Sequence, residues 1–361
     1  QGDAVALLAC LARAKPLWGR LIFTLASCAG DPLRGLDSLV EGLSPLEADG
    51  ARHALQLLHV LCLLGTGPSS AIHEALRKLT PQGCCGLDAV IELAGAEDSA
   101  TQREALSLLA ELSCQSEATK ESLLDRLTEG PAGQQGLDRL VVLLDNPDPA
   151  LRRVLLALLT ELALHSPEAG RDLLDRIAPE GQGPGRLITL AAVISGSRVQ
   201  PANLAMRLLS AMAFGHADSA RRVAAALDAS GGQGLRDICR AVGAPSQHTR
   251  RLSMELLWVL AIRIPDLAGA IGRALTDTDR DIFLDIAREI PAGAQLEAMR
   301  LLGRLAEACP GLRPAIGHAL GEDGGARLAQ VKAHADGEGL KQRAARGLLA
   351  ALDEAAAKPA S

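Results

Sequence analysis

Aromatic residues are scarce in this sequence. Two Trp, three Phe and no Tyr amount to 1% of the 361 residues. Strands are enriched in aromatic and β-branched side chains, so this scarcity argues against a fold built on a sheet. Leu and Ala, both strong helix formers, dominate the 48% of hydrophobic residues instead. The composition therefore predicts an all-α protein with an aliphatic core.

A surplus of basic charge is also lacking. The chain has 37 Lys and Arg residues against 43 Asp and Glu residues, which gives a net charge of −6. Proteins that bind nucleic acid usually neutralise phosphates with an excess of Lys and Arg. We therefore expect no nucleic-acid partner. Arg greatly outnumbers Lys, and Ala and Gly are abundant, which is typical of a GC-rich genome.

Long apolar runs and paired cysteines are missing too. A membrane-spanning helix needs about 20 apolar residues, and the sequence has no uninterrupted run of that kind. The eight Cys are scattered through apolar stretches, which is typical of buried free thiols rather than of a disulfide framework. We therefore expect no membrane partner and a reducing, cytoplasmic location.

Signatures of metal, cofactor and catalytic sites are absent from the sequence. The eight His form no His-x-x-x-His or His-Glu-x-x-His pair, whereas a zinc site needs three or four converging ligands. The Gly-rich segments 181–185 and 231–234 contain no Gly-Lys-Ser/Thr and follow no predicted strand, as phosphate loops would. We therefore expect no metal, no cofactor and no catalytic residues, and we interpret the chain as a protein that is not an enzyme.

The sequence does contain a phrase that recurs about every 50 residues. Each copy has an apolar residue, which we call the anchor, at the end of a segment such as Leu-Asp-Arg. Gly-Leu-Asp or a variant of it follows further along the chain. In one copy the anchor is Leu127, and Gly136-Leu137-Asp138 follows it. A fixed period of this size is typical of stacked helical repeats, which bury their core only between neighbours. The anchors fall at residues 79, 127, 177, 227, 275 and 320.

One repeat shows the pattern of three helices in full. A first helix is predicted from Ser166 to Ala178, with Ser166 as the N-cap and Pro167 in the first turn. A Gly-rich loop follows, and a second helix is predicted over 186–194. The third helix is predicted from about residue 200 to 214, with apolar residues on one face. Similar loops recur at the same phase, as in 128–136.

This pattern resembles armadillo repeats and the related HEAT repeats. The resemblance rests on Gly-Leu-x-x-Leu-Val segments such as 136–141, on the Asx/Pro turn that follows, and on a long Leu/Ala third helix. It implies a right-handed α-solenoid of three-helix repeats of about 45–50 residues, with the third helices lining a groove. The expected organisation is a partial repeat or cap at 1–34, an array of about six repeats at 35–355, and a tail at 356–361.

The resemblance does not extend to nuclear-import cargo. Armadillo proteins of nuclear import hold basic peptides with a ladder of Trp and Asn on the third helices, and this chain carries other residues at the matching positions. Their charge changes from acidic or neutral in the first half to more basic in the second, so we hypothesise that Arg207, Arg300 and Arg304 contact carboxylates of a partner. The predicted groove consists of Gln56, Ser107, Glu111, Glu161, Arg207, Glu255, Arg300 and Arg304.

The function predicted from these features is that of a protein-binding scaffold or adaptor, with a protein or peptide as its partner. One alternative is a helical-repeat protein or enzyme that acts on nucleic acid. Another is a bacterial effector, secreted or not, or a chaperone-like regulator that binds proteins. Trp258 lies in an apolar run and is expected in the core. Trp18 is expected to be exposed at the N-terminal end of the array, where an open apolar face would indicate either missing upstream repeats or a contact between copies of the chain.

Overall fold

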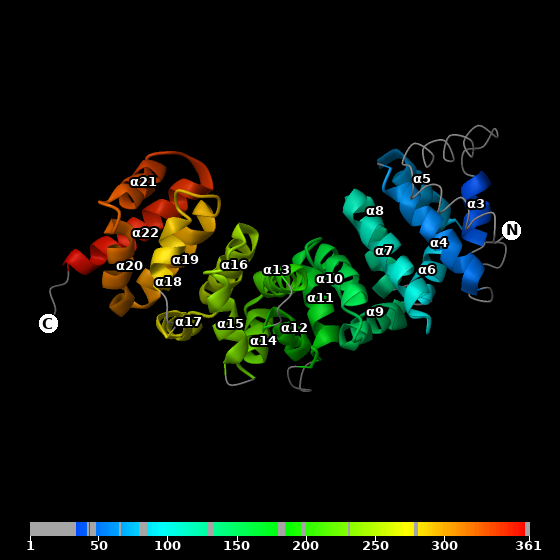
Figure 1. The fold of residues 1–361 in the computed structure, drawn as a ribbon, viewed down its shortest axis with the longest axis horizontal. Helices are drawn as coiled ribbons and strands as arrows, with labels where there is room; N and C mark the ends of the chain where they lie inside the picture. The colour runs from blue at the N-terminus through cyan, green and yellow to red at the C-terminus, as the bar shows by residue number, and fades with distance from the viewer. Residues whose placement is uncertain are drawn as a thin grey trace. The chain divides into compact units, whose positions relative to one another are not determined.

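The helical chain divides into two compact units, residues 1–176 and 177–361 (Figure 1). It is known from a computed structural model, which describes residues 34–41, 43, 48–64, 66–78, 85–128, 133–179, 185–195, 199–229, 232–277 and 281–357. Segment 1–33 lies outside the described residues, as does the end of the tail from 358. The expected N-terminal cap and the expected exposure of Trp18 both concern this first segment. None of the described helices is long and apolar enough to cross a membrane.

The helices of the first unit follow the predicted order of first, second and third helix. A second and a third helix come first, and two full repeats follow before the first helix of the next one. They are α3 (Arg34–Glu41), α4 (Ala48–Cys62), α5 (Thr66–Arg77), α6 (Gly86–Ala94), α7 (Ser99–Gln115), α8 (Glu117–Thr128), α9 (Gly133–Val142), the 3₁₀ helix η1 (Leu143–Asp145), α10 (Pro149–Ala163) and α11 (Pro167–Ile177).

The second unit continues the same order. A second and a third helix complete the repeat that α11 begins, and three further repeats follow. They are α12 (Leu187–Ser195), α13 (Val199–Gly215), α14 (Ala217–Asp228), α15 (Gln233–Ala241), α16 (Gln247–Arg263), α17 (Leu267–Thr276), α18 (Ile282–Arg288), α19 (Gln295–Ala308), η2 (Pro310–Leu312), α20 (Arg313–Gly321), α21 (Ala326–Ala335) and α22 (Gly339–Ala357).

The expected all-α repeat is confirmed, and its boundaries agree with the sequence pattern to within about two residues. Helix α11 starts at Pro167, where the Ser166 hydroxyl accepts a hydrogen bond from the Ala169 amide at 3.0 Å. Two boundaries differ. Helix α9 begins at Gly133, within the expected loop, and α22 runs to Ala357, two residues into the expected tail.

The core of each unit lies between neighbouring repeats, as expected for a repeat that cannot bury its apolar face alone. One Leu position of the third helix shows this clearly, because it recurs at repeat spacing and is at most 1% exposed in every copy. The copies are Leu57, Leu108, Leu158, Leu208, Leu256 and Leu301.

The recurring phrase is a packing contact between the first and second helices of one repeat. Glycine near the start of the second helix approaches the last turn of the first helix so closely that an added Cβ would make a tight contact with it. A Cβ on Gly136 would lie 3.2 Å from Leu127 Cδ2, and one on Gly234 would lie 3.0 Å from the Leu227 carbonyl oxygen.

In the first full repeat, the glycine makes this contact with Leu76. A Cβ on Gly86 would lie 3.2 Å from the Cα of Leu76, which is fully buried. The expected anchor, Leu79, lies outside the described residues.

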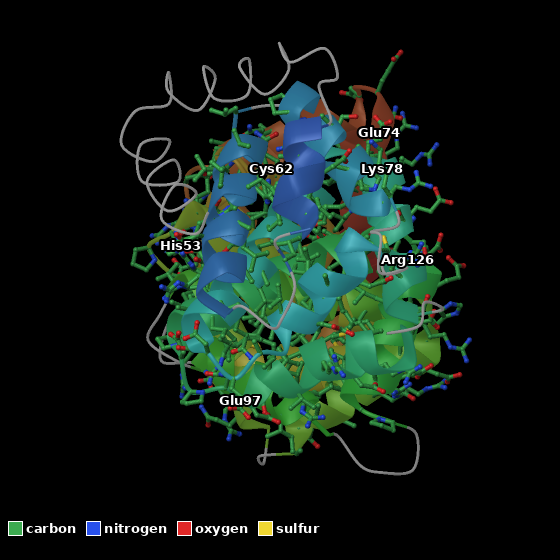
Figure 2. All side chains as sticks on the ribbon, turned by 90° about the vertical axis from the view of Figure 1, so that its right-hand side faces the viewer. His53, Cys62, Glu74, Lys78, Glu97 and Arg126 are labelled. Carbon is green, nitrogen blue, oxygen red and sulfur yellow. The ribbon has the colours of Figure 1, made fainter. Side chains whose placement is uncertain are left out.

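In the first unit, the Asp of Gly-Leu-Asp pairs with a basic residue of the next repeat's first helix. Asp88 Oδ2 lies 3.4 Å from Arg126 Nη1, and Asp138 Oδ2 lies 3.1 Å from Arg176 Nη1. Figure 2 shows Arg126 on one side of the ribbon and His53, of third helix α4, on the other. In the second unit, both the Asp and the basic residue are replaced. The residues at the matching positions, again 38 residues apart, are Ile188 with Ala226 and Arg236 with Ala274.

The cysteines that the structure describes carry free thiols, in agreement with their scatter in the sequence. Cys62 and Cys239 are fully buried, and burial raises the pKa of each thiol to about 12. Cys85 is also buried and donates a hydrogen bond from its Sγ to the Leu76 carbonyl oxygen at 2.9 Å. These three thiols belong to the packing of the repeats.

Adding a methyl group at the recurring glycine should destabilise the fold. Gly185 has φ of +51°, and a Cβ there would lie 2.6 Å from the Ile177 carbonyl oxygen. We expect Gly185→Ala to lower the free energy of unfolding by about 1–3 kcal/mol, through backbone strain and overpacking. Urea unfolding followed by circular dichroism measures the change.

Gly317 of α20 is the matched control, because a Cβ at this position would meet nothing within 4 Å. Gly317→Ala should leave stability unchanged or raise it by about 0.5–1 kcal/mol, because Ala favours the helix. Equal unfolding midpoints for Gly185→Ala and the unchanged protein would contradict the role assigned to the glycine contact.

Candidate functional site

The residues predicted for the groove lie on the third helices, and the two units divide them into two sets. In the first unit, α4, α7 and α10 pack side by side in chain order. In the second unit, α13, α16, α19 and α22 do the same. We call the exposed side of these helices the third-helix face of each unit. Gln56, Ser107, Glu111 and Glu161 belong to the first unit, and Arg207, Glu255, Arg300 and Arg304 to the second.

On the first unit, Gln56 is joined to the neighbouring third helix by an acidic residue that the sequence analysis missed. The Gln56 amide donates a hydrogen bond to Glu104 Oε1 at 3.3 Å, and His59 Nδ1 lies 3.7 Å from Glu104 Oε2. Ser107 is half-buried one turn further along α7. Gln56 thus contributes to the packing of α4 on α7.

Glu161 of the first unit is also engaged within the chain. Lys120 Nζ lies 3.5 Å from Glu161 Oε2 and 3.0 Å from Glu117 Oε1. Burial alone would lower the pKa of Lys120, but the contacts with Glu117 and Glu161 outweigh it and raise the pKa. Glu111 accepts a hydrogen bond from the Gln115 amide. These carboxylates are therefore already partnered on the third-helix face.

The selected positions predicted an acidic to neutral third-helix face on the first unit, but this face also carries basic residues. Arg103 and Arg153 are exposed and precede Ser107 and Ala157 by four residues, which places them on the same side of α7 and α10, one turn earlier. The face of the first unit therefore carries both signs of charge. The expectation was wrong because it considered only two positions on each helix.

On the second unit, the predicted residues of three successive third helices act on one another. Burial raises the pKa of Glu255, and the like charge of Glu297 raises it further. The positive charges of Arg251, Arg207 and Arg300 oppose this rise. Arg207 of α13, Glu255 of α16 and Arg300 of α19 thus form one charge cluster across three helices.

Trp258 takes part in this face, in contrast to the core position expected from the sequence. It is half-buried, and the Arg300 guanidinium carbon lies 4.6 Å from the centre of its ring. This distance is typical of a cation–π contact. Arg304 lies beside them, donates to the Ala261 carbonyl oxygen at 3.1 Å and pairs with Glu307 at 2.8 Å.

A row of exposed apolar residues at the ends of the third helices was missed by the sequence analysis. Leu63 and Leu164 are 58% and 44% exposed in the first unit, and Phe214 and Ile262 are 51% and 46% exposed in the second. The Arg263 guanidinium carbon lies 5.4 Å from the Phe214 ring centre. Their spacing matches the repeat, with exposed Cys114 between Leu63 and Leu164. These residues could have been singled out from the sequence, because they occupy the same position in successive repeats.

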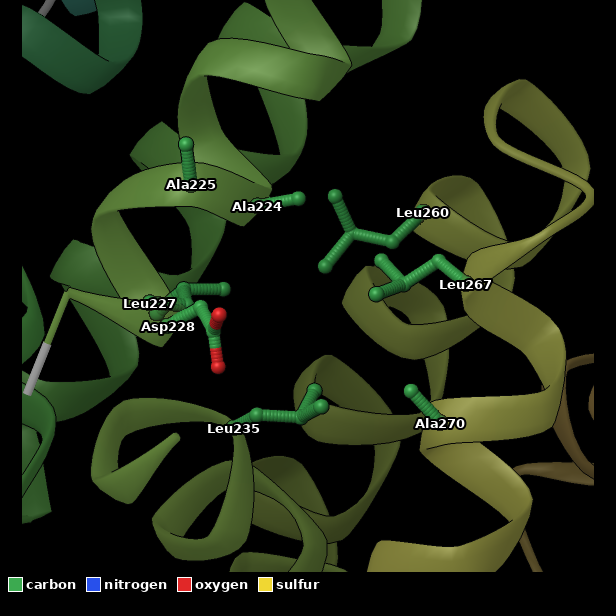
Figure 3. Close-up of a pocket in the computed structure, with 8 residues that line it drawn as sticks. All are labelled: Ala224, Ala225, Leu227, Asp228, Leu235, Leu260, Leu267 and Ala270. Carbon is green, nitrogen blue, oxygen red and sulfur yellow. The ribbon is translucent and has the colours of Figure 1, made fainter. Parts of the chain in front are cut away.

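Described residues of the second unit line at least two hollows. One, of about 370 Å³, opens on the third-helix face between α16, α19 and α22, and its lining includes Trp258, Arg300 and Arg343. The other, of about 230 Å³, lies among α14–α17 and is apolar apart from Asp228 (Figure 3). Its lining residue Leu260 is two positions from Trp258, so the two side chains point to nearly opposite sides of α16. The second hollow is therefore separate from the third-helix face.

A metal centre has no support in the part of the chain that the structure describes. No group of three or more His, Cys, Asp or Glu side chains is placed there to hold an ion.

Comparisons with known proteins place the fold. No protein-family model matches the sequence, and no curated protein matches it. A computationally designed armadillo repeat protein for modular peptide recognition superimposes with a TM-score of 0.58 at 14% identity, over 74% of this chain and 99% of its own. The designed armadillo repeat protein YIII(Dq)4CqI gives a TM-score of 0.57 at 14% identity, over 75% of this chain and 99% of its own.

A further solved structure, described as an engineered protein, covers 98% of this chain and 95% of its own, with a TM-score of 0.54 at 17% identity. At these identities the likeness concerns the fold. The chain is an armadillo-like helical repeat protein with an all-α solenoid fold.

The charge cluster predicts how Glu255 titrates. Its pKa should lie above the ordinary value of 4.5, and Arg300→Gln should raise it further, because one of the opposing positive charges is removed. An acid with a raised pKa in the folded state binds its proton more tightly than in the unfolded chain. Stability should therefore fall as the pH rises from the unfolded to the folded pKa. Carbon-13 NMR of the Glu carboxyl groups measures the titration.

Arg240→Gln is the control for this titration, because Arg240 is exposed on the second helix α15 and pairs with Asp237. It should leave the Glu255 pKa unchanged. A Glu255 pKa at or below 4.5, or one that Arg300→Gln leaves in place, would show that the cluster has been assigned wrongly.

Proposed function

We propose that this protein is a non-enzymatic scaffold that binds a carboxylate-bearing segment of a protein or peptide on the third-helix face of its second unit. The observation that carries the proposal is the charge cluster of Arg207, Glu255 and Arg300 on three successive third helices. An extended or helical partner could follow these helices from α13 to α19.

Charge supports a partner that is acidic. Arg207 is exposed and Arg300 is half-exposed, and Arg251 adds a third positive charge within electrostatic reach of Glu255. Arginine presents a planar set of donors that matches a carboxylate with two parallel hydrogen bonds. Three arginines, Arg207, Arg251 and Arg300, stand against two acids, Glu255 and Glu297, so positive charge is in excess in the cluster.

Exposed apolar side chains support a protein partner. Phe214 and Ile262 are about half exposed on α13 and α16, and Trp258 of α16 is half-buried beside Arg300. Aromatic residues and Arg are enriched at the energetically dominant positions of protein interfaces. Independent support comes from the likeness of the fold to a repeat protein that was designed for modular peptide recognition.

Nucleic acid is the less favoured partner on this face. The chain has no surplus of basic residues, with 37 Lys and Arg against 43 Asp and Glu, whereas binding of a phosphate backbone depends largely on such a surplus. Sequence-tolerant binding of single strands also uses a series of stacking aromatics along a basic groove, whereas Trp258 is surrounded by aliphatic and charged side chains. A bacterial effector or chaperone-like role would use the same protein-binding face.

Charge reversal tests the proposal. Fluorescein-labelled peptides of equal length and equal apolar content, one rich in Glu, one in Gln and one in Lys, are titrated with the protein and followed by fluorescence anisotropy. The Glu peptide should bind best, more weakly as salt screens the charges. Replacing Arg207 and Arg300 together by Glu should weaken its binding by at least about tenfold, because each substitution removes a charge-assisted hydrogen bond to the peptide.

Arg221→Glu is the matched control. Arg221 is exposed on first helix α14, and its replacement by Glu changes the net charge by the same amount as each of the two substitutions in the double variant. It should leave binding of the Glu peptide intact. Equal binding of the Lys peptide, or unchanged binding of the Glu peptide by the double variant, would contradict the proposed function.

A further inference from the structure

We propose that the pocket between α16, α19 and α22 is an anchor site for one bulky apolar side chain of the partner, whose flanking carboxylates pair with Arg300 and Arg343. This inference rests on the proposed function and names the chemistry of the segment that is bound. It places the most specific contact at the C-terminal end of the second unit's third-helix face.

The pocket exists because small residues line two of its helices. Gly303 of α19 approaches α22 so closely that a Cβ on it would lie 3.3 Å from both the Leu348 amide nitrogen and its Cα. Ala344 and Gly347 of α22 line the opening, and a Cβ on Gly347 would meet nothing within 4 Å. The volume of about 370 Å³ lies within the range of small ligand sites.

Apolar side chains form the inner lining of the pocket. Trp258 and Ile262 come from α16, Met299 from α19 and Leu348 from α22. Met299 and Leu348 are fully buried, while Trp258 and Ile262 keep part of their surface exposed. Binding of a Leu- or Phe-sized group would remove this surface of Trp258 and Ile262 from solvent, which is favourable by about 25 cal/mol for each Å² buried.

Arginines dominate the polar part of the lining. Arg300, Arg304 and Arg343 line the pocket together with a single acidic residue, Glu307. Glu307 pairs with Arg304 at 2.8 Å. Arg300 and Arg343 form no ion pair within 4.0 Å among the residues that the structure describes. The pocket therefore carries two positive charges that no carboxylate of its own lining neutralises.

The position of Arg300 favours a carboxylate as its partner. Its guanidinium stacks on Trp258 at 4.6 Å, and stacking leaves the N–H groups at the edge of the plane available for hydrogen bonds. Arg343 reaches the same pocket from α22. A segment with an apolar residue between carboxylates would satisfy both Arg residues and fill the apolar lining at once.

Filling the pocket from the protein side tests the inference. Gly347→Leu places an apolar side chain in the opening without a backbone clash, and it should favour the helix. Gly317→Leu is the matched control, because Gly317 is equally open and lies on first helix α20, away from the pocket. Circular dichroism and thermal unfolding of each variant confirm that it is folded.

The probes are three labelled peptides, one with a central Leu flanked by Glu, one with Ala in place of Leu, and one with Gln in place of Glu. We expect the Leu/Glu peptide to bind about tenfold or more tightly than either other peptide. Gly347→Leu should weaken it by a similar factor and Gly317→Leu should not. Arg343→Gln should weaken the Leu/Glu peptide while leaving the Leu/Gln peptide unaffected.

The outcomes separate the anchor site from the proposed function. If the Leu/Glu peptide binds, loses affinity in the Arg207/Arg300 double variant and yet binds Gly347→Leu normally, the anchor site is wrong and the proposed function stands. If no peptide of the panel binds, both are wrong. Displacement of the peptide from the pocket by a single-stranded oligonucleotide at physiological salt would overturn the assignment of a protein partner.

Discussion

The fold of this protein depends on a close approach between two helices that recurs in each regular repeat. A glycine at the start of the second helix packs against the last turn of the first helix, at Gly86, Gly136, Gly185 and Gly234. A Cβ at these positions would lie 2.6–3.2 Å from the nearest atom of the first helix, so the glycine allows the two helices to pack closely. The third-helix face, with its charges and exposed apolar side chains, is positioned by this packing.

The two units use charge differently on that common frame. In the first unit, Asp88 and Asp138 form ion pairs with the next repeat, and Glu161 on the third-helix face is held by Lys120. In the second unit, other residues replace both members of these Asp–Arg pairs, and three arginines, Arg300, Arg304 and Arg343, line the pocket on the third-helix face. The Asp138–Arg176 pair is solvent-exposed, and such pairs contribute at most about 1 kcal/mol, whereas Asp88 is buried. Arg300 and Arg343 form no ion pair among the described residues, whereas Glu161 on the third-helix face of the first unit is paired with Lys120.

Much of the fold could be predicted because the copies of the repeat within the chain can be aligned with one another. Comparing copies gave the helix bounds, the caps at Ser166 and the buried Leu positions, since each copy tests the others. The face of each third helix was harder to predict. Trp258 lies within an apolar run, and the pocket beside it is also lined by residues of two later helices, such as Gly303 and Gly347, which the run itself does not reveal. Phe214 and Ile262 could have been found, because Leu63, Leu164 and these two residues share one repeat phase.

The central claim is that a carboxylate-bearing segment binds on the third helices of the second unit. Hydrogen exchange of the backbone amides, measured with and without the Glu-flanked Leu peptide, tests it most directly, because bound helices open less often. The account predicts added protection in α13, α16, α19 and α22, with the first helices α14, α17 and α20 unchanged. Protection confined to those first helices, or spread over the first unit alone, would contradict it.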